Sequence, residues 1–293
     1  MKILIAGASG YIGSQLLPIF VEAGHDVVAL VRSTKRLHPA QVSKVTVVEA
    51  DLHSDAPLSL PHDIEVAYYL VHSMAHRPSG FAELEEKQAL HFMQAIEKTQ
   101  AKQIIYLSGL SKERAQSEHM RSRHRVEELL FAGKIPVTVL RAGIIIGAKS
   151  ASFKIMYDLV RRLPVMVAPK WVRSYCQPIA IQDVLFYLQG VMLKKECMGQ
   201  TFEIGGPDQL TYYEMLHALA KAMGKRRAIL LVPVLTPYLS SLWLVLVTSV
   251  NFSIARALVH SLTVDAICSE GNIHKVLPHT CLDFITSVKK ELS

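Results

Sequence analysis

The chain opens with an apolar run at Lys2–Ala6 that leads into a glycine-rich sequence, Gly7-Ala8-Ser9-Gly10-Tyr11-Ile12-Gly13. Apolar residues at helical spacing follow as far as Gly24, and a second apolar run occupies Asp26–Val31. A strand, a glycine turn, a helix and a second strand within about 30 residues form the unit that binds the pyrophosphate of a dinucleotide. The sequence therefore predicts a dinucleotide-binding βαβ unit at these residues.

Each glycine of this motif has a separate physical role. We expect Gly7 to allow the tight turn, Gly10 to let the pyrophosphate approach the backbone, and Gly13 to let the helix pack against the strand. The phosphates would then lie against free N–H groups at the positive end of the helix. Pro18 falls inside the predicted helix, where we expect a kink downstream of the phosphate site.

The residue that ends the second strand indicates which cofactor is bound. An acidic residue there holds the ribose 2′-hydroxyl of NAD, whereas an arginine accommodates the 2′-phosphate of NADP. This chain has Arg32 at that position, and no carboxylate follows until Glu49. Arginine is also an ordinary surface residue at a strand end, which is the competing interpretation. The sequence favours NADP(H), with NAD as the alternative.

Apolar runs near residues 3, 27, 45, 66, 104, 137 and 202 alternate with helical patterns such as Phe81–Lys98 and Met120–Phe131. This alternation predicts an α/β fold with a doubly wound parallel sheet of the Rossmann type. We place this domain at residues 1–206 and a smaller, apolar carboxyl-terminal region at residues 207–293. In such a fold the ligand crevice lies at the carboxyl ends of the strands.

The composition limits the classes of partner. Half of the 293 residues are hydrophobic and the net charge is +7, but the basic residues are dispersed and accompany no nucleic-acid-binding signature. A nucleic-acid partner is therefore not expected. The four cysteines form no CxxC pair, which favours reduced thiols and a cytoplasmic location. His274, His279 and Cys281 lack the spacing of ligands on one helix face, so no metal site is expected.

Six segments carry a resemblance to a known superfamily. They are GASGYIG at 7–13, AYYLVHSM at 67–74, IIYLSGL at 104–110, LRAGIIIG at 140–147, QPIAIQDV at 177–184 and FEIGGPDQLTYYEM at 202–215. With them the chain resembles the atypical, extended-type short-chain dehydrogenase/reductase superfamily. More narrowly, it is similar to bacterial NAD(P)-binding proteins related to the Rossmann accessory subunit of respiratory complex I.

The resemblance implies further site residues. Asp51 and Leu52 match the pair that contacts adenine, and Ser108 matches the active-site serine or threonine of the superfamily. A segment at the end of the fourth strand matches residues beside the nicotinamide ribose: Leu70, Val71 and His72. Two of these residues also have a simpler explanation. Asp51 could be a helix cap or loop residue, and Ser108 a turn residue at a strand end.

The chain departs from the superfamily at the catalytic pair. Active members use Tyr-x-x-x-Lys, yet none of the ten tyrosines here is followed four residues later by a lysine. The matching positions hold His119 and Arg123. One interpretation makes His119 the replacement acid, with Arg123 supplying positive charge. The other makes both residues solvated side chains of a helix. The first predicts an oxidoreductase acting on a lipophilic carbonyl or quinone-like substrate, and the second a non-catalytic redox-sensing or assembly protein.

An uncharged segment at Ala228–Ala255 follows the basic residues Lys225, Arg226 and Arg227. Prolines and serines interrupt it, which argues against one spanning helix. We expect it to line a lipophilic cleft or to dock peripherally on a membrane, which for a cytoplasmic protein would be the inner face. A true membrane span is the third alternative.

Overall fold

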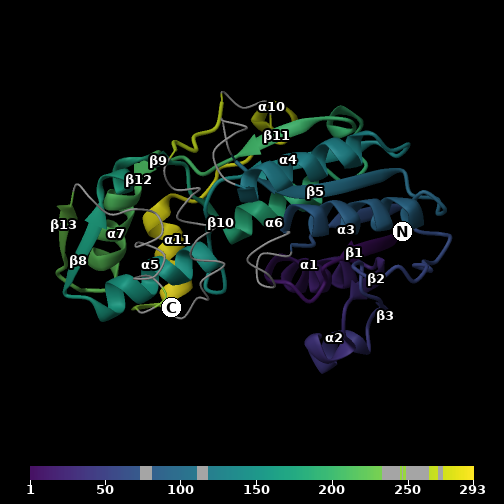
Figure 1. Ribbon diagram of the computed structural model, residues 1–293, viewed down its shortest axis with the longest axis horizontal. Coiled ribbons are helices and arrows are strands. Elements are labelled where there is room, and N and C mark those ends of the chain that lie inside the picture. The colour runs from purple at the N-terminus through teal and green to yellow at the C-terminus, as the bar shows by residue number, and fades with distance from the viewer. Residues whose placement is uncertain (73–80, 111–117, 233–244, 246, 249–263, 270–272) are drawn as a thin grey trace.

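The computed structural model describes residues 1–72, 81–110, 118–232, 245, 247–248, 264–269 and 273–293. Two lobes are apparent in Figure 1, one built on a large sheet near the amino terminus and one that gathers α5, α7, α11, β8 and β13. The helix and strand numbers below follow that figure.

The first lobe contains a seven-stranded parallel sheet in the order β11-β6-β5-β4-β1-β2-β3. Its strands are β1 (Lys2–Ala6), β2 (Asp26–Val31), β3 (Thr46–Glu49), β4 (Val66–Tyr69), β5 (Gln103–Gly109), β6 (Val137–Ala142) and β11 (Thr201–Ile204). Each of the seven apolar runs in the sequence is one of these strands. The predicted doubly wound α/β fold is confirmed.

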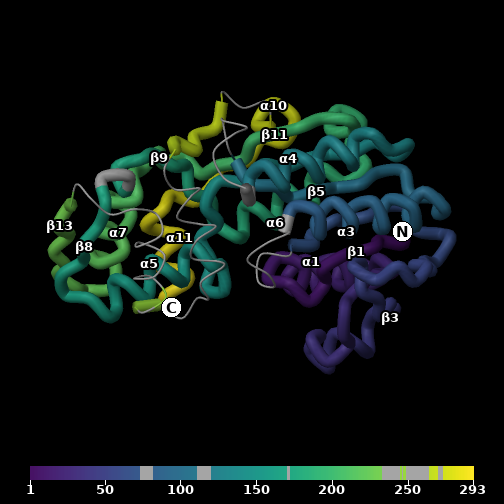
Figure 2. Tube along the Cα trace, viewed as in Figure 1, coloured from purple at the N-terminus to yellow at the C-terminus, as the bar shows by residue number. Residues whose placement is uncertain are grey.

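Helices cover both faces of this sheet (Figure 2). They include α1 (Tyr11–Glu22), α3 (Phe81–Ile96), α4 (Glu118–Phe131) and α6 (Ile181–Gly190), and short helical segments η1 (Thr34–Arg36), α2 (Pro39–Val42), η3 (Lys195–Cys197) and α10 (Ile273–Val276) lie in the connections. Successive residues of β1 point to opposite faces, so that Ile3 packs in one core cluster and Leu4 in the other. Both faces are buried, which is why the strands are continuous apolar runs rather than alternating ones.

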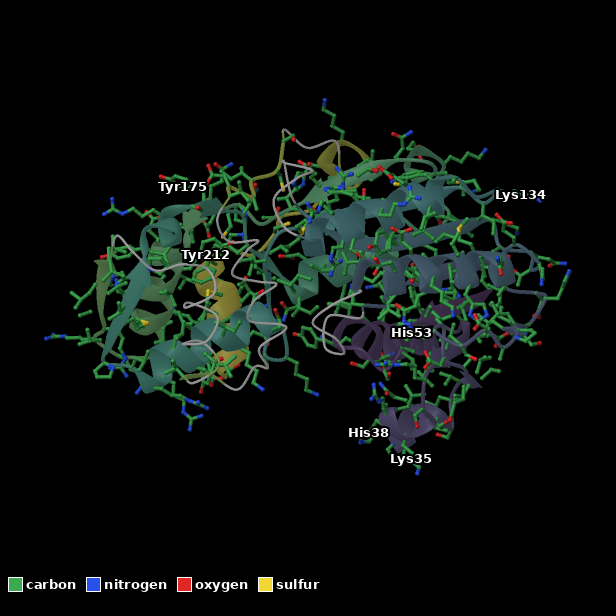
Figure 3. The ribbon with its side chains drawn as sticks, viewed as in Figure 1. Lys35, His38, His53, Lys134, Tyr175 and Tyr212 are labelled. Carbon is green, nitrogen blue, oxygen red and sulfur yellow. The ribbon has the colours of Figure 1, made fainter. Side chains whose placement is uncertain are left out.

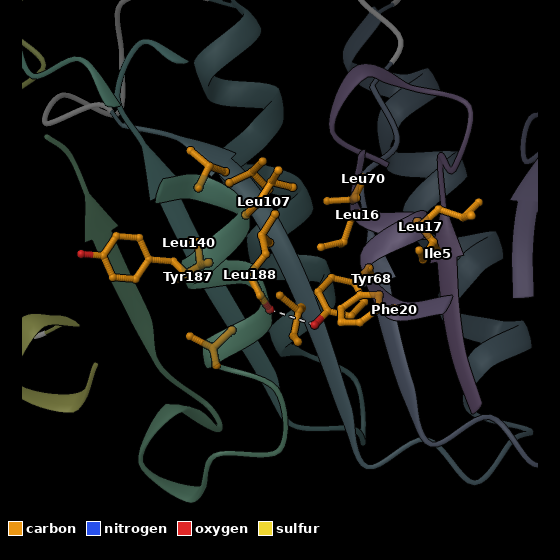
Figure 4. Close-up of a cluster of buried hydrophobic side chains, with 14 of the residues drawn as sticks. Ile5, Leu16, Leu17, Phe20, Tyr68, Leu70, Leu107, Leu140, Tyr187 and Leu188 are labelled. Atoms are coloured by element: carbon orange, nitrogen blue, oxygen red, sulfur yellow. Dashed lines mark hydrogen bonds between the residues drawn. The ribbon is translucent and has the colours of Figure 1, made fainter. Parts of the chain in front are cut away.

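The core on the α1 and α6 side contains a buried polar link between the sheet and a helix. Phe20 packs against Tyr68 with ring centroids 5.2 Å apart. The Tyr68 hydroxyl, which has no access to solvent, donates a 2.8 Å hydrogen bond to the Leu188 carbonyl (Figure 4). This bond satisfies the phenol inside an apolar environment and fixes the position of α6 on the sheet.

Pro18 does not interrupt α1, which runs as one helix from Tyr11 to Glu22. A proline has no N–H, so the carbonyl of Ser14, four residues earlier, loses its helical donor. The side-chain amide of Gln41 donates to this carbonyl instead, at 3.0 Å. The α2 segment that carries Gln41 is thereby attached to α1.

The second lobe has its own core. It contains α5 (Ala151–Arg162), β8 (Val165–Pro169), η2 (Lys170–Arg173), α7 (Tyr212–Ala222), β13 (Ala228–Val232) and α11 (Phe284–Leu292), with β7 (Ile145–Ile146), β9 (Tyr175–Cys176), β10 (Ile179–Ala180) and β12 (Leu210–Thr211) in short two-stranded sheets. Its buried cluster joins Phe153 and Leu159 of α5 to Leu219 of α7 and Val288 of α11. The packing of this lobe thus draws on residues from both sides of position 206.

Only the first part of the uncharged segment is described. Ala228–Val232 forms β13, which pairs in parallel with β8. Most of the remainder, including Leu244 and Leu246, lies outside the described residues. Among the helices that the structure describes, none is long and apolar enough to cross a membrane.

Candidate functional site

The glycine turn has the geometry that the sequence predicts. Gly7 adopts φ +87°, and a Cβ at this position would lie 2.7 Å from the Leu70 carbonyl oxygen. A Cβ on Gly13 would overlap the Gly7 carbonyl oxygen and lie 2.8 Å from the Ala8 Cα. Gly7 is therefore required by the turn, and Gly13 by the close approach of α1 to the end of β1.

The amino-terminal end of α1 is open to a ligand. Gly10 is the N-cap residue, its N–H is bonded to the Gly7 carbonyl at 2.9 Å, and no side chain caps the helix. The N–H groups of the first helical turn have no partner within the helix and carry its positive dipole end. This arrangement suits the phosphates of a dinucleotide.

A cleft of about 330 Å³ lies over this turn. Eleven of the predicted cofactor residues line it: Gly7, Ser9, Gly10, Tyr11, Ile12, Gly13, Arg32, Leu52, Leu70, Val71 and His72. Two of the predicted cofactor residues do not line the cleft. Ala8 is fully buried in the core, and Asp51 points away into its own loop, where its carboxylate accepts a 3.0 Å hydrogen bond from the His53 N–H. This bond fits the loop interpretation of Asp51, and its contact with adenine stays a prediction.

The Tyr11 side chain connects two of the sequence motifs. A Cβ on Gly147 would overlap the Tyr11 hydroxyl, so this glycine, which ends the segment LRAGIIIG, makes room for the phenol of GASGYIG. Burial raises the pKa of Tyr11. The phenol therefore stays protonated and forms one wall of the cleft.

Two arginines stand at the cleft beyond β2. Arg32 and Arg36 both line it, both are exposed, and neither forms an ion pair with another described residue. Glu49, the carboxylate at the end of β3, is already engaged, because it accepts hydrogen bonds from the backbone and hydroxyl of Thr34. These bonds lower the pKa of Glu49 and hold the η1 segment that carries Arg36.

The structure adds lining residues that the sequence did not single out. Arg36 was visible as a basic neighbour of Arg32 but was not assigned to the site. Gln88 comes from α3, is almost fully buried, and has its amide 2.9 Å from His53 Nε2. Nothing in the local sequence indicates that this face of α3 reaches the cleft, because that depends on how the helix packs.

Ser108, one of the proposed catalytic residues, lies at the end of β5 next to the cleft. Leu107 lines the cleft, and the next residue, Ser108, has a side chain that is 3% exposed. The Ser108 hydroxyl makes no hydrogen bond of regular geometry. It nevertheless lies close enough to Glu127 and to the Tyr106 hydroxyl to lower the pKa of both groups.

Arg123 is not a solvated side chain. It is 8% exposed, and its guanidinium donates a 3.3 Å hydrogen bond to the Leu107 carbonyl. The interpretation of Arg123 as a solvent-facing helix residue is therefore wrong: the arginine packs under the end of β5. His119 belongs to α4, but its side chain is outside the described residues, so its role stays a prediction.

A buried ion pair supports this end of the sheet. The Glu127 carboxylate accepts three hydrogen bonds from Arg141: the Nε–H group lies 3.2 Å from Oε1 and 3.1 Å from Oε2, and Nη2 also donates to Oε2. His124 Nδ1 lies 3.7 Å from Oε2. Burial on its own would raise the pKa of Glu127. The hydrogen bonds with His124 and Arg141, and the proximity of Ser108, outweigh it and hold the pKa at about 2.

Comparison with solved structures shows the same architecture in other proteins. A nucleoside-diphosphate-sugar epimerase from Staphylococcus aureus superposes with a TM-score of 0.77 at 14% identity, covering 99% of this chain and 100% of the other. The UDP-glucuronic acid 4-epimerase from Bacillus cereus, solved with UDP-glucuronic acid and NAD, gives 0.74 at 16% identity, covering 99% and 98%. At these identities the likeness establishes the fold.

Comparison with curated proteins finds remote relatives of one kind. The chloroplastic divinyl chlorophyllide a 8-vinyl-reductase of Arabidopsis thaliana is 23% identical over 256 residues, covering 80% of this chain and 60% of the relative. The reductase of Zea mays is 24% identical over 251 residues, covering 79% and 62%. The chain thus spans about three fifths of the length of these relatives.

A family model fits most of the chain. It describes the NmrA-like family and matches residues 1–263. Together with the fold, this match confirms the resemblance to the atypical short-chain dehydrogenase/reductase superfamily. The narrower relation to the complex I accessory subunit stays a prediction. The chain belongs to the NmrA-like family.

Proposed function

We propose that this protein binds NADP(H) in the cleft above the glycine turn. The observation that carries the proposal is the pair Arg32 and Arg36, two exposed guanidinium groups at the end of β2 with no carboxylate partner among the described residues. An adenosine 2′-phosphate would give both a partner, and NAD(H) lacks that group. The glycine turn and the open end of α1 would hold the pyrophosphate.

As the catalytic activity we propose reduction of a lipophilic carbonyl, quinone-like or conjugated acceptor. The bound dinucleotide would supply a hydride beside the ends of β4 and β5. Ser108, next to the cleft-lining Leu107, has a hydroxyl that would donate a hydrogen bond to an oxygen of the acceptor. Arg123, held by the Leu107 carbonyl, would fix the end of β5, and His119 would deliver the proton. The reductase relatives are in keeping with this class of reaction.

The competing function is that of a protein which binds the cofactor without turnover. The altered Tyr-x-x-x-Lys pair favours it, because Arg123 cannot move a proton and already has a structural contact. Consumption of NADPH with a panel of carbonyl and quinone compounds separates the two functions. Reproducible turnover that depends on Ser108 supports the enzyme, whereas tight NADPH binding without turnover on any compound supports the binding protein.

We further propose that the second lobe contacts an anionic membrane surface. Parallel pairing of β8 with β13 places Val165, Val167 and Leu230 on one exposed face, and Leu230 is 56% exposed. The same pairing brings two basic runs to one end of this sheet, Arg161–Arg162 before β8 and Lys225–Arg227 before β13. Apolar side chains next to clustered cations suit the interface of an anionic bilayer.

A further inference from the structure

Three side chains that bind metals elsewhere in proteins meet beside α6. Asp183 belongs to α6, while His279 and Cys281 belong to the segment between α10 and α11. One ligand atom from each lies within 4.8 Å of the other two. The residues are remote in sequence, since Asp183 and His279 are 96 positions apart, yet His279 Nε2 lies 2.7 Å from Asp183 Oδ1.

These side chains are held in place by neighbours. The second carboxylate oxygen of Asp183 accepts a 2.9 Å hydrogen bond from the Leu282 N–H. The ring of Phe186 stacks on His279 with centroids 3.9 Å apart. The Tyr187 hydroxyl, which points away from the Phe20–Tyr68 pair (Figure 4), lies 3.4 Å from Cys281 Sγ. Contacts of this kind orient ligands and tune them in known metal sites.

We infer that Asp183, His279 and Cys281 bind a divalent transition-metal ion of the zinc type. A carboxylate, an imidazole and a thiolate are donors that Zn²⁺ accepts in tetrahedral sites. The Asp183 side chain is 4% exposed, so this is not a solvated surface acid. His274 lies next to this group, since its Nδ1 is 3.4 Å from the same Tyr187 hydroxyl.

The required rearrangement is small. Ligand atoms of a tetrahedral zinc ion are roughly 3.3–3.8 Å apart. The separations here, from 2.7 Å to within 4.8 Å, bracket that range, so changes of about 1 Å by side-chain rotation suffice. Asp183 Oδ1 would exchange its hydrogen bond with His279 for the metal, and Oδ2 would keep the Leu282 N–H.

The position of the site suggests what the metal does. Ile273 of α10 is buried in the first-lobe core, and Phe284 of α11 in the second-lobe core. His279 and Cys281 lie on the segment that connects these two helices. A metal bridge to α6 would therefore fix the path of the chain between the two cores. None of its ligands lines the proposed cofactor cleft, so a result that contradicts the metal site would leave the proposed function unaffected, and the reverse also holds.

The test uses the full chain, freed of metal with a chelator and titrated with Co²⁺. We expect one Co²⁺ per chain, an absorption spectrum of tetrahedral cobalt with a thiolate-to-cobalt charge-transfer band, and loss of that spectrum on addition of Zn²⁺. Cys281→Ser should abolish the charge-transfer band. His279→Gln removes a ligand and should therefore weaken Zn²⁺ binding by more than the ~10–100-fold that is typical of losing an outer-shell partner. Cys268→Ser is the matched control, because Cys268 is another half-buried cysteine outside the triad.

Two results overturn the inference. One is the absence of a thiolate charge-transfer band in the unmodified chain, which needs no variant. The other is a band that persists in Cys281→Ser or disappears in Cys268→Ser. Circular dichroism checks that each variant is folded, and His279→Gln gives an independent result if Cys281→Ser does not fold.

Discussion

Replacing Arg32 tests the cofactor site most directly. The guanidinium lines the cleft, is exposed, and has no ion-pair partner among the described residues, so its removal breaks no ion pair within that part of the chain. Arg36 is the second cation at the same place. Lys35 is the matched control: it lies between them in sequence, is exposed at the outer end of the segment before α2 (Figure 3), and does not line the cleft.

The expected size of the preference for NADPH follows from the solvent exposure of Arg32. A charge-assisted hydrogen bond contributes about 1.5–3 kcal/mol, and solvent screening favours the lower end for exposed groups. About 1.5 kcal/mol is slightly more than tenfold in Kd. The unmodified protein should therefore bind NADPH about ten- to a hundredfold more tightly than NADH. Arg32→Ala should remove roughly tenfold of that preference, Arg32→Asp should erase or reverse it, and Lys35→Ala should leave it within about twofold.

Calorimetric titration of NADPH and NADH at two salt concentrations measures these differences. The NADPH preference should shrink at the higher salt, because exposed charges are screened there. Affinity for NADH should not change in Arg32→Ala, since NADH has no 2′-phosphate. Equal affinities of the unmodified protein for the two cofactors would refute the assignment of Arg32 to a phosphate.

Five further substitutions probe other parts of the molecule. Gly10→Val should abolish NADPH binding without unfolding the chain, because Gly10 has an ordinary φ of −74° but faces the cleft. Gly24→Ala is the opposite case: this glycine has φ +78° and no neighbour near its Cβ position, so the change should cost about 1 kcal/mol of stability and leave NADPH affinity unchanged. Arg141→Met should lower the free energy of unfolding by about 3–5 kcal/mol at pH 7, because it leaves the Glu127 carboxylate buried without its cation. The loss should be smaller at pH 4, where Glu127 can take up a proton. An equal loss at both pH values in urea titrations would contradict this. If His119 is the proton donor, His119→Ala should reduce turnover about 10²–10⁴-fold with NADPH affinity unchanged, and unaltered steady-state rates would remove it from the mechanism. Leu230→Glu should reduce cosedimentation with anionic vesicles, and equal binding of both proteins would exclude this face as the docking surface.

The pH dependence of stability has a definite sign at Glu127. Its folded pKa of about 2 lies below the ordinary value of 4.5. The carboxylate therefore contributes stability that is complete above about pH 4.5 and is lost as the pH falls towards 2. The difference between the two pKa values corresponds to about 3 kcal/mol of folding free energy. Solvent screens this contribution little, because the Glu127 side chain is only 4% exposed.

The sequence predicted the first lobe well because local signals determine it. The ranges expected for the first two strands, Lys2–Ala6 and Asp26–Val31, are those of β1 and β2. Apolar runs mark strands that are buried on both faces, and Gly7 and Gly13 mark backbone positions that exclude a side chain. Such signals need no knowledge of distant residues.

Contacts between distant segments were not predictable. The helical spacing of His119 and Arg123 does not say which side of α4 faces the sheet, so Arg123 was open to interpretation as solvated although it is buried against Leu107. His279 and Cys281 lacked ligand spacing because the third member of their group, Asp183, is supplied by α6 from far earlier in the chain.

The proposed cofactor binding and the proposed chemistry would depend on different kinds of atoms in this protein. The pyrophosphate site is made of backbone: a turn at Gly7, the open N–H groups of α1, and the space left at Gly13. The proposed catalytic position would instead be made of side chains, and one of the altered pair, Arg123, already donates a hydrogen bond to the carbonyl of Leu107. A phosphate site made of backbone atoms survives the substitution of side chains elsewhere. Proton transfer, in contrast, is lost when the one side chain that carries the proton is replaced. The fold can therefore keep its cofactor whether or not it keeps turnover, and for that reason NADPH affinity and NADPH consumption must be measured as separate properties.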